Sequence, residues 1–323
     1  MFNLLKDYTR IISLHPDKRI EIGAQGACRY CRKTPVDVTF KSEAHALPEL
    51  IGNKFIYSRD ECDDCNSYFD RNLENDLANF LGILRTTTAV KGKKGVPGFK
   101  SKEGERVERI NDCLVLVEHQ DSSLICDVAA SESILIKTKT NPYRPARVFK
   151  CFAKMAIAAL PEQELKLHRR CVDWVRGIST SPPPDPRMLV TKLTMLSGHH
   201  PFLHPSISIW KRKERSRRHP RLLAILCFQN FVFEFCLPLS KKDSHIDESD
   251  FALPDLALPW GLHSTGGNAT VSIVDLSDRE RVVSERTAAL KLERPWEAID
   301  LNEIPAELRA HIEKLGLQIG APR

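Results

Sequence analysis

The chain has 323 residues, of which 42% are hydrophobic and 28% charged, the composition of an ordinary globular protein with room for about two domains. No apolar run reaches the roughly 18 residues of a membrane helix and the first residues lack a signal-peptide pattern, so we expect a cytoplasmic protein without membrane contact. The formal net charge of +6 points only weakly to a polyanionic partner.

The first hundred residues alternate between glycine-rich turns and short periodic segments. Residues 1–27 are predicted to form a lead-in helix or arm that ends in turns at Gly23 and Gly26. Val36–Lys41 alternates between apolar and polar residues and predicts a strand. Asn66–Leu84 has apolar residues at three- and four-residue spacing, which predicts a helix.

The middle of the chain changes from strand-like to helical patterns. Three short β-like runs are predicted at Cys113–Val117, Leu124–Val128 and Ile134–Lys137. Two helices are then predicted, the first over Pro145–Leu160, with a proline at its start and another just past its end. The second covers Glu162–Val175.

A proline-rich segment, Ser179–Pro186, predicts an extended linker and a domain boundary. Beyond it, strands are predicted over Met188–Leu196, Ser206–Trp210 and Leu222–Leu237, the last with a hairpin turn at Gln229 and Asn230. A helix is expected around Pro305–Leu315. These elements predict an α+β fold with five parts: an N-terminal domain with its arm (1–105), a β-then-helical extension (106–178), the linker (179–186), a strand-rich domain (187–295) and a C-terminal helix or tail (296–323).

Four of the ten cysteines form two tight pairs with the spacing C-x2-C, thirty residues, C-x2-C. Because thiolates at this spacing can surround zinc tetrahedrally, Cys28, Cys31, Cys62 and Cys65 predict a structural zinc site. The other six cysteines lie in apolar stretches, where a reduced cysteine behaves as a small buried hydrophobe. The alternative interpretation of the four-cysteine site is a plain zinc ribbon, in which the zinc is structural and no reaction is catalysed.

Two polar residues set this region apart from a plain ribbon. His45 lies near the end of the predicted strand, and Asn66 directly follows Cys65 at the start of the predicted helix. The zinc ion would therefore join the strand end to the helix start and bring His45 close to Asn66.

The region resembles the HNH (ββα-metal) endonucleases, and most closely their four-cysteine zinc subgroup. That subgroup has C-x2-C, a strand that ends in E-x-H-x-x-P-x-x-x-G, and then C-x2-C-N. The residues that match in order are Cys28, Cys31, Glu43, His45, Pro48, Gly52, Cys62, Cys65 and Asn66.

The resemblance implies a ββα-metal fold and a hydrolytic mechanism that uses one catalytic ion. His45 would be the general base that takes a proton from the attacking water. A divalent ion, Mg or Mn, would bind the phosphate and the leaving oxygen, held in part by His45 and Asn66. Asn66 and the helix N-terminus would help to position the phosphate.

The sequence departs from the broader family at its metal ligands. Many members carry an acidic residue or a histidine directly before the base, where this chain has Ala44. Glu43 is the natural substitute, since residues two apart on a strand share a face. Asp70 could supply a carboxylate one helical turn after Asn66, as could Glu74, although either could equally be a solvated acid on the helix face. Asn53 is the nearest candidate for the middle asparagine, with a turn role as its alternative.

Two basic runs could neutralise DNA phosphates, or could equally be solvated surface loops. Five lysines and no acid lie between Lys91 and Lys102, and a second dense run covers Lys211–Arg221. The candidate nucleic-acid contacts in and around these runs are Arg85, Lys91, Lys93, Lys94, Lys211, Arg212, Lys213, Arg215, Arg217 and Arg218.

Together these features predict an HNH endonuclease that cuts DNA, with the strand-rich half serving another purpose. That half could read DNA, bind a small signal or dock a partner protein that activates the nuclease. This arrangement resembles the effectors of bacterial anti-phage defence or restriction systems, which is an analogy only. The alternatives are a DNA-binding zinc module without catalysis, which Ala44 favours, and a partner-docking protein in which zinc is only a staple.

Overall fold

The large sheet of the protein has six antiparallel strands in the order β1-β11-β12-β13-β10-β14 in the computed structural model. Its central strands, β12 and β13, are buried along nearly their whole length, so they read as continuous apolar runs rather than alternating ones. The predicted hairpin is confirmed: Gln229 has a φ of 52° at the turn between them. The strands are β1 (Tyr8–Leu14), β10 (Val190–Leu196), β11 (Phe202–Arg212), β12 (Leu222–Gln229), β13 (Phe231–Cys236) and β14 (Ala269–Asp275).

The structure describes residues 7–92, 94–101, 105–110, 113–117, 125–128, 133–178, 183–198, 200–214, 216, 218–246, 251–254, 269–291, 306 and 309–310. The predicted helix around Pro305–Leu315 falls almost entirely outside them. No helix in these ranges is both long and apolar enough to cross a membrane.

The N-terminal segment is a strand of the large sheet, so the prediction of a lead-in helix or free arm is wrong for β1. This strand pairs with β11 from Tyr8 opposite Arg212 to Leu14 opposite Ile207. Its neighbouring isoleucines, Ile11 and Ile12, are β-branched residues that favour strands. The pairing joins the first described residues to a strand that lies about 200 positions later.

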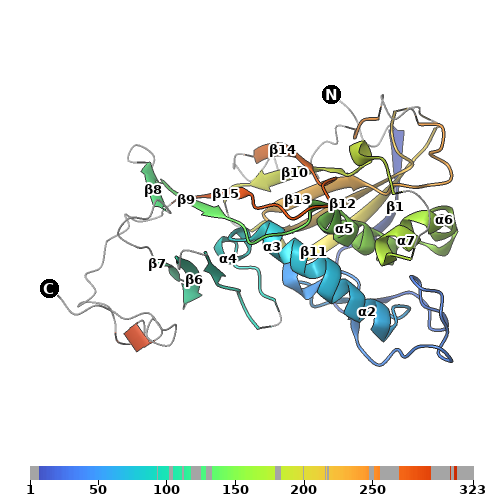
Figure 1. Ribbon diagram of the computed structural model, residues 1–323, viewed down its shortest axis with the longest axis horizontal. Helices are drawn as coiled ribbons and strands as arrows, with labels where there is room; N and C mark the ends of the chain where they lie inside the picture. The colour runs from blue at the N-terminus through green and yellow to red at the C-terminus, as the bar shows by residue number, and fades with distance from the viewer. Residues whose placement is uncertain are drawn as a thin grey trace.

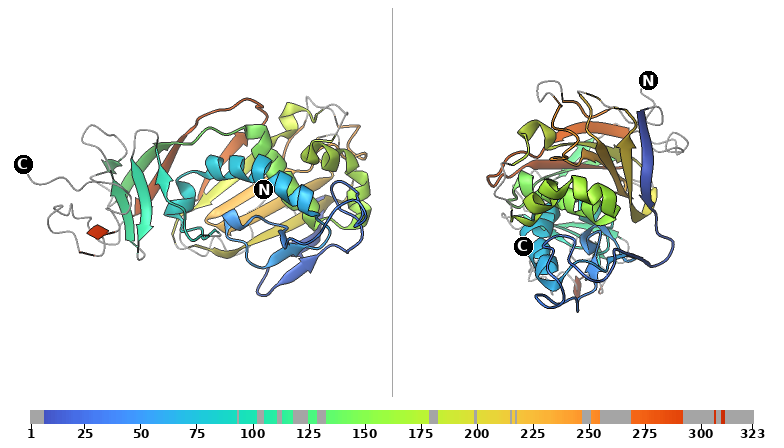
Figure 2. Two further views of the ribbon diagram at one scale, coloured as in Figure 1. Left: turned by 60° about the horizontal axis from the view of Figure 1, so that its bottom comes forward. Right: turned by 90° about the vertical axis from the view of Figure 1, so that its right-hand side faces the viewer.

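Three helices lie on one face of the large sheet, beside the helical stretch that follows the zinc cysteines (Figure 1, Figure 2). Helix α5 (Pro145–Ala159) matches its prediction and begins with proline in its first turn. Its Phe152 ring packs 4.9 Å from Phe233 and 5.4 Å from Phe235, measured between centroids. The second predicted helix is broken at His168, whose φ is −106°. It forms α6 (Glu162–Leu167) and α7 (Arg169–Arg176).

A three-stranded sheet in the order β2-β4-β3 precedes the helical stretch. The predicted strand over Val36–Lys41 is wrong, because these residues form a turn in which Asp37 accepts hydrogen bonds from the backbone and hydroxyl of Thr34. Such local side-chain bonds compete with strand pairing. The elements are β2 (Ile20–Ile22), β3 (Ala44–His45), η1 (Glu49–Ile51), β4 (Ile56–Ser58), α2 (Asp63–Phe69), the π-helical turn η2 (Asp70–Glu74), α3 (Asn75–Leu81) and α4 (Leu84–Thr87).

Two small sheets lie beyond these layers, in the orders β5-β6-β7 and β15-β9-β8. The three β-like runs predicted in the middle of the chain are confirmed as β7, β8 and β9. The remaining elements are β5 (Phe99–Lys100), β6 (Arg106–Ile110), β7 (Cys113–Val117), β8 (Ile125–Val128), β9 (Ser133–Lys139), η3 (Pro186–Met188) and β15 (Glu285–Lys291).

The larger of two hydrophobic clusters in the described chain runs from the paired cysteines through α5 to the large sheet. The fold is the α+β mixture that the sequence predicts, with a strand-rich C-terminal region. The predicted units at 1–105 and 187–295 therefore share their packing, with α5 lying between them.

Candidate functional site

Four cysteine sulfurs converge where the turn at Cys28–Cys31 meets the start of α2. The Sγ atoms of Cys28, Cys31, Cys62 and Cys65 all lie within 4.8 Å of one another. The first pair sits on a tight turn closed by a 2.8 Å bond from the amide of Arg32 to the carbonyl of Cys28. The second pair occupies the N-cap and first turn of α2. Since four thiolates at this spacing match the closed tetrahedral site that zinc prefers, the residues present fit a structural zinc ion.

Helix α7 supports this cysteine cluster from outside. The Nε of Arg176 donates a 3.1 Å hydrogen bond to the Sγ of Cys65. The guanidinium of Arg169 donates hydrogen bonds to the carbonyls of Arg29 and Tyr30, which lie between Cys28 and Cys31. A positive charge and a hydrogen bond at a sulfur both favour its thiolate form. Within the described chain, no other group of three or more His, Cys, Asp and Glu residues could share an ion.

His45 ends the short strand β3, where it pairs with Tyr57 of β4. The centroids of the two rings lie 4.5 Å apart, and 21% of the histidine side chain is exposed to solvent. Burial lowers the pKa of His45 below its usual value, against the opposing charge of Glu49. The ring is therefore mostly neutral at pH 7 and can accept a proton.

Asn53 is fully buried and organises the loop between β3 and β4. Its amide nitrogen donates to the carbonyls of Leu47 and Ile56 at 2.6 and 2.9 Å and lies 3.3 Å from the Nδ1 of His45. Its amide oxygen accepts from the backbone of Phe55 and Ile56. Both amide hydrogens of Asn53 thus point to the closer carbonyls. His45 therefore packs against Asn53 without accepting a strong hydrogen bond at its Nδ1.

A buried ion pair lies beneath the histidine strand. The Nζ of Lys154, in α5, donates a 2.7 Å hydrogen bond to the carbonyl of His45 and lies 3.2 Å from Oε2 of Glu61. Both side chains are almost wholly buried. Burial lowers the pKa of Lys154, but the charges of Glu61 and Glu74 outweigh this and raise it, so the amine stays charged. The sequence does not predict this contact, because Lys154 is a single charged residue among mainly apolar residues in α5.

Two glutamates flank His45 in the sequence, one before β3 and one in the turn after it. Glu43 precedes β3, so the argument that it shares a strand face with His45 does not apply, and its carboxylate is 2.7 Å from Arg19 and largely exposed. Glu49 is closer, with its Oε1 4.0 Å from the Nε2 of His45. It also pairs with Lys54 at 2.6 Å. The sequence reasoning gave no role to Glu49, although its position four residues after His45 placed it nearby.

The helix after the cysteines carries the other candidate ligands. Asn66 lies in the first turn of α2, and its side chain makes no hydrogen bond with any described residue. It makes no hydrogen bond with His45. Lys154, which bonds to the carbonyl of His45, lies 5.6 Å from the ring centre of Phe69 and interacts electrostatically with Glu74. Asp70 is exposed at the start of the π-helical turn. Burial raises the pKa of Glu74, and the charges of Asp70 and Glu49 add to this, so carboxylates gather on this side of the helix.

The first basic run lies beside this arrangement. The Nζ of Lys54, which pairs with Glu49, lies 3.5 Å from the carbonyl of Gly92. The flanking lysines Lys91 and Lys94 are exposed. Arg85 is part-buried and donates to the carbonyl of Leu50 at 3.1 Å, so it supports the turn after His45 from within. Lys93 lies outside the described residues.

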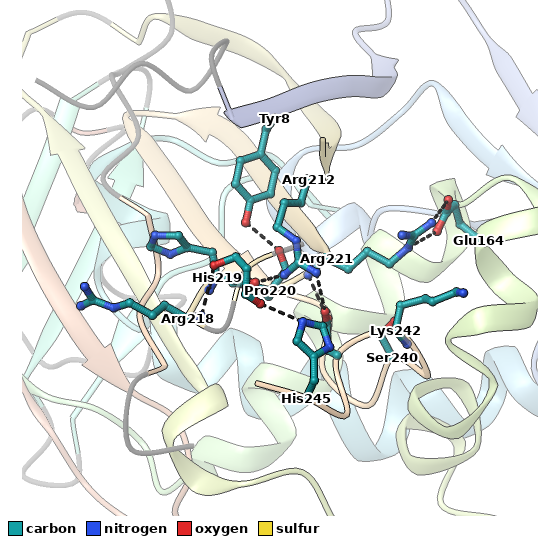
Figure 3. Close-up of polar contacts among 12 residues, drawn as sticks. Tyr8, Glu164, Arg212, Arg218, His219, Pro220, Arg221, Ser240, Lys242 and His245 are labelled. Atoms are coloured by element: carbon teal, nitrogen blue, oxygen red, sulfur yellow. Dashed lines mark hydrogen bonds and ion pairs between the residues drawn. The ribbon is translucent and has the colours of Figure 1, made fainter. Parts of the chain in front are cut away.

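The second basic run is largely engaged within the fold. Arg221 makes two 3.0 Å hydrogen bonds to the carboxylate of Glu164 (Figure 3), and Lys211 lies 2.9 Å from the same carboxylate. Arg212 is nearly buried, with only 8% of its side chain exposed, and lies 3.5 Å from Asp243. Buried cations need such partners because desolvation is costly.

Further contacts hold the loop after β11 in place. Tyr8 donates a 2.6 Å hydrogen bond to the carbonyl of Pro220, and His245 approaches the carbonyl of Ser216 at 2.9 Å. Arg212 donates to the carbonyl of His219 (Figure 3). Of the predicted DNA contacts in this run, Lys213 and Arg218 are exposed and Arg215 and Arg217 lie outside the described residues. A DNA-binding role for the run stays a prediction that the pairing of Lys211 and Arg212 does not favour.

Comparison with known families agrees with this geometry. Residues 28–81 match the family described as HNH endonuclease. These are the residues that bring together the cysteine cluster, His45 and the helical stretch. Searches of curated proteins and of solved structures gave no significant match.

Proposed function

We propose, from the HNH nuclease domain that residues 28–81 form, that this protein is a metal-dependent endonuclease that hydrolyses DNA. The observation that carries the proposal is His45: a neutral, partly exposed imidazole on a strand that Asn53 and Lys154 hold in place. Such a ring can take a proton from water, which is the task of a general base in phosphodiester hydrolysis.

A catalytic Mg²⁺ or Mn²⁺ ion would have His45 and Glu49 as its nearest donors, since the Nε2 and Oε1 atoms of these side chains lie 4.0 Å apart. Asn66 and Asp70 stay candidate oxygen donors from the helical stretch, and Asp70 does not cluster with this pair. Few protein ligands suffice, because Mg²⁺ commonly retains several waters and binds one or two carboxylates together with substrate phosphate. The bound ion would supply charge stabilisation at the phosphate and the leaving oxygen.

The protein's own groups would then hold the substrate and the proton. The exposed lysines Lys91 and Lys94, on either side of the Gly92 carbonyl that Lys54 approaches, would hold the DNA backbone. His45 would accept the proton of the attacking water. Lys154 and Glu61 would keep the histidine strand fixed during the reaction, since both are locked in the core.

Plasmid cleavage with added Mg²⁺ or Mn²⁺ tests this proposal, with His45→Ala as the matched variant. Loss of a general base typically costs about 10²–10⁴-fold in rate. We expect the variant to lose cleavage at that scale while its zinc content and circular dichroism stay unchanged. Equal cleavage by the variant would contradict the assignment.

A non-catalytic DNA-binding module is the second candidate. It is favoured by Ala44, which is buried where many family members have a metal ligand, and by the few ligands near His45. It predicts salt-sensitive DNA binding with no cutting under either metal.

We further propose an effector role in bacterial anti-phage defence or restriction. What supports it is the shared core that couples the nuclease domain to a larger strand-rich unit. On this proposal the purified protein cuts poorly or nonspecifically until a partner or signal engages that unit. Robust site-specific cleavage by the protein alone would indicate a restriction enzyme.

A further inference from the structure

A cavity opens between the start of α5 and the end of α7. It has a volume of about 430 Å³, within the range of about 300–1,000 Å³ that small-molecule sites occupy. Four of its lining residues are cations, and none is acidic. The cationic members are Arg144, Arg147, Lys150 and Arg279.

The cations come from two elements that are fastened together. Arg144, Arg147 and Lys150 recur every third residue from the start of α5, so they lie near one another on one side of the helix. Arg279 comes from the loop after β14. That loop is tied to the helix by a 2.8 Å bond from the amide of Ala146 to the carbonyl of Asp278.

The positive charge of this cationic pocket is largely unneutralised. Among the described residues, Arg144, Lys150 and Arg279 have no carboxylate within ion-pair distance, and Arg147 has only Asp76, at 3.6 Å. Burial and the neighbouring charges of Arg147 and Arg279 lower the pKa of Lys150 to about 8. Crowded cations without acids cost free energy, which an incoming anion would relieve.

The rest of the wall is apolar. Trp174, Leu189 and Pro183 also line the cavity, and the Nζ of Lys150 lies 4.9 Å from the centre of the indole ring. A site that combines cationic and apolar residues suits a ligand with a charged group on an organic body. A bare inorganic ion would leave the apolar residues unused.

We propose that the cationic pocket binds a small phosphorylated ligand of nucleotide size. Arginine and lysine are the residues that recognise phosphate, arginine through paired donors and lysine as a point charge. The pocket also adjoins the nuclease domain. Gly177, on its wall, packs against the hydroxyl of Tyr68 in α2, and the preceding Arg176 bonds to Cys65.

Calorimetry on the full-length, zinc-loaded protein tests the proposal with ATP, pyrophosphate and adenosine as probes and a short DNA duplex as competitor. We expect ATP and pyrophosphate to bind and adenosine not to bind. Lys150→Met and Arg279→Gln should each weaken ATP binding about tenfold, which corresponds to losing one charged contact. Arg281→Gln, an exposed arginine of the same loop outside the cavity, should bind ATP as the wild type does.

Several results would overturn the proposal. They are no binding of ATP or pyrophosphate, equal binding of adenosine, or ATP affinity unchanged by both variants. Loss of DNA affinity in Arg279→Gln without any ATP binding would assign the cations to DNA instead. If Lys150→Met fails to fold, as judged by circular dichroism, Arg279→Gln carries the test alone, because its side chain is exposed.

Discussion

The ammonium group of Lys154 donates a 2.7 Å hydrogen bond to the backbone carbonyl of His45, 109 positions earlier in the chain. The position of the candidate base is therefore fixed by a helix that lies outside residues 28–81. The same ammonium neutralises Glu61, whose two oxygens have no well-formed hydrogen bond among the described residues. One buried cation thus serves both the histidine strand and a buried acid.

Replacing that cation is expected to cost both stability and activity. Lys154→Met leaves Glu61 buried without its partner, and breaking a buried ion pair in this way typically costs about 3–5 kcal/mol. Urea denaturation measures the loss. The double variant Lys154→Met/Glu61→Leu removes both charges and should recover much of the stability but not the DNA cleavage rate. A Lys154→Met protein as stable as wild type would show that the pair does not hold this region together.

Asn53 should be required for the loop between β3 and β4. Asn53→Ala removes the side-chain partners of the Leu47 carbonyl and the Ile56 amide, and an unsatisfied buried group costs about 1–3 kcal/mol. We expect a lower thermal midpoint and slower cleavage, because His45 loses its packing neighbour. Asn75→Ala, at an exposed position at the start of α3, is the matched control and should behave as wild type.

Zinc content should depend on Arg176 as well as on the cysteines. Cys65→Ser is expected to lose stoichiometric zinc and ordered helix, since structural zinc contributes about 10–16 kcal/mol of apparent binding free energy. Arg176→Met removes the hydrogen bond to Cys65 and should weaken zinc affinity by about 10–100-fold, the usual effect of losing a partner of a metal ligand. Competition with a chelator measures this affinity. Arg170→Met, exposed on the same helix, should leave it unchanged.

The two basic runs should differ in their contribution to DNA binding. Lys91→Gln and Lys94→Gln should each weaken binding and reduce the salt dependence of log K by about one unit of slope, the signature of one lost phosphate contact. Lys211→Gln should change neither, because Lys211 is paired with Glu164. Fluorescence anisotropy across a salt series measures all three. The opposite ranking would place the DNA on the other side of the molecule.

Binding of ATP to the cationic pocket should weaken in alkali. The pKa of Lys150 is lowered to about 8 by burial, Arg147 and Arg279, against the opposing influence of Cys171. Without a bound ligand, the amine of Lys150 therefore loses its charge as the pH rises through about 8. The affinity for a phosphate should be highest below that pH and should fall above it. Calorimetry between neutral and alkaline pH measures the trend. It should be absent in Lys150→Met; the same alkaline loss in that variant would exclude Lys150 as its source.

Local patterns in the sequence predict much of the fold. The helix over α5 is marked by its prolines, and the β12–β13 hairpin by a turn between two apolar runs. The strand predicted at Val36–Lys41 fails because a two-residue interaction, between Thr34 and Asp37, overrides the alternation. The role of β1 is hidden for a different reason: its partner strand is remote in sequence, and no local pattern encodes that pairing.

The candidate site divides in the same way. The cysteine spacing and the position of His45 can be recognised as motifs, because these residues follow one another in a single stretch from Cys28 to Asn66. Lys154 and Glu61 are not, since their interaction exists only after α5 packs against the helix that follows the cysteines. The sequence also gives no sign that Lys211 pairs with Glu164 and Arg212 with Asp243. A basic run has the same sequence whether or not acidic residues from elsewhere in the fold neutralise it.

The placement of β1 has a consequence for how the protein is made. Tyr8 bonds to Pro220, 212 positions later, so at synthesis rates of about 5–20 residues per second this strand waits on the order of tens of seconds for its partner. The packing of α5 likewise waits for Phe233 and Phe235. The anchored histidine strand is thus completed only after β13 has been made, and a shorter nascent chain would not yet carry the assembled candidate site.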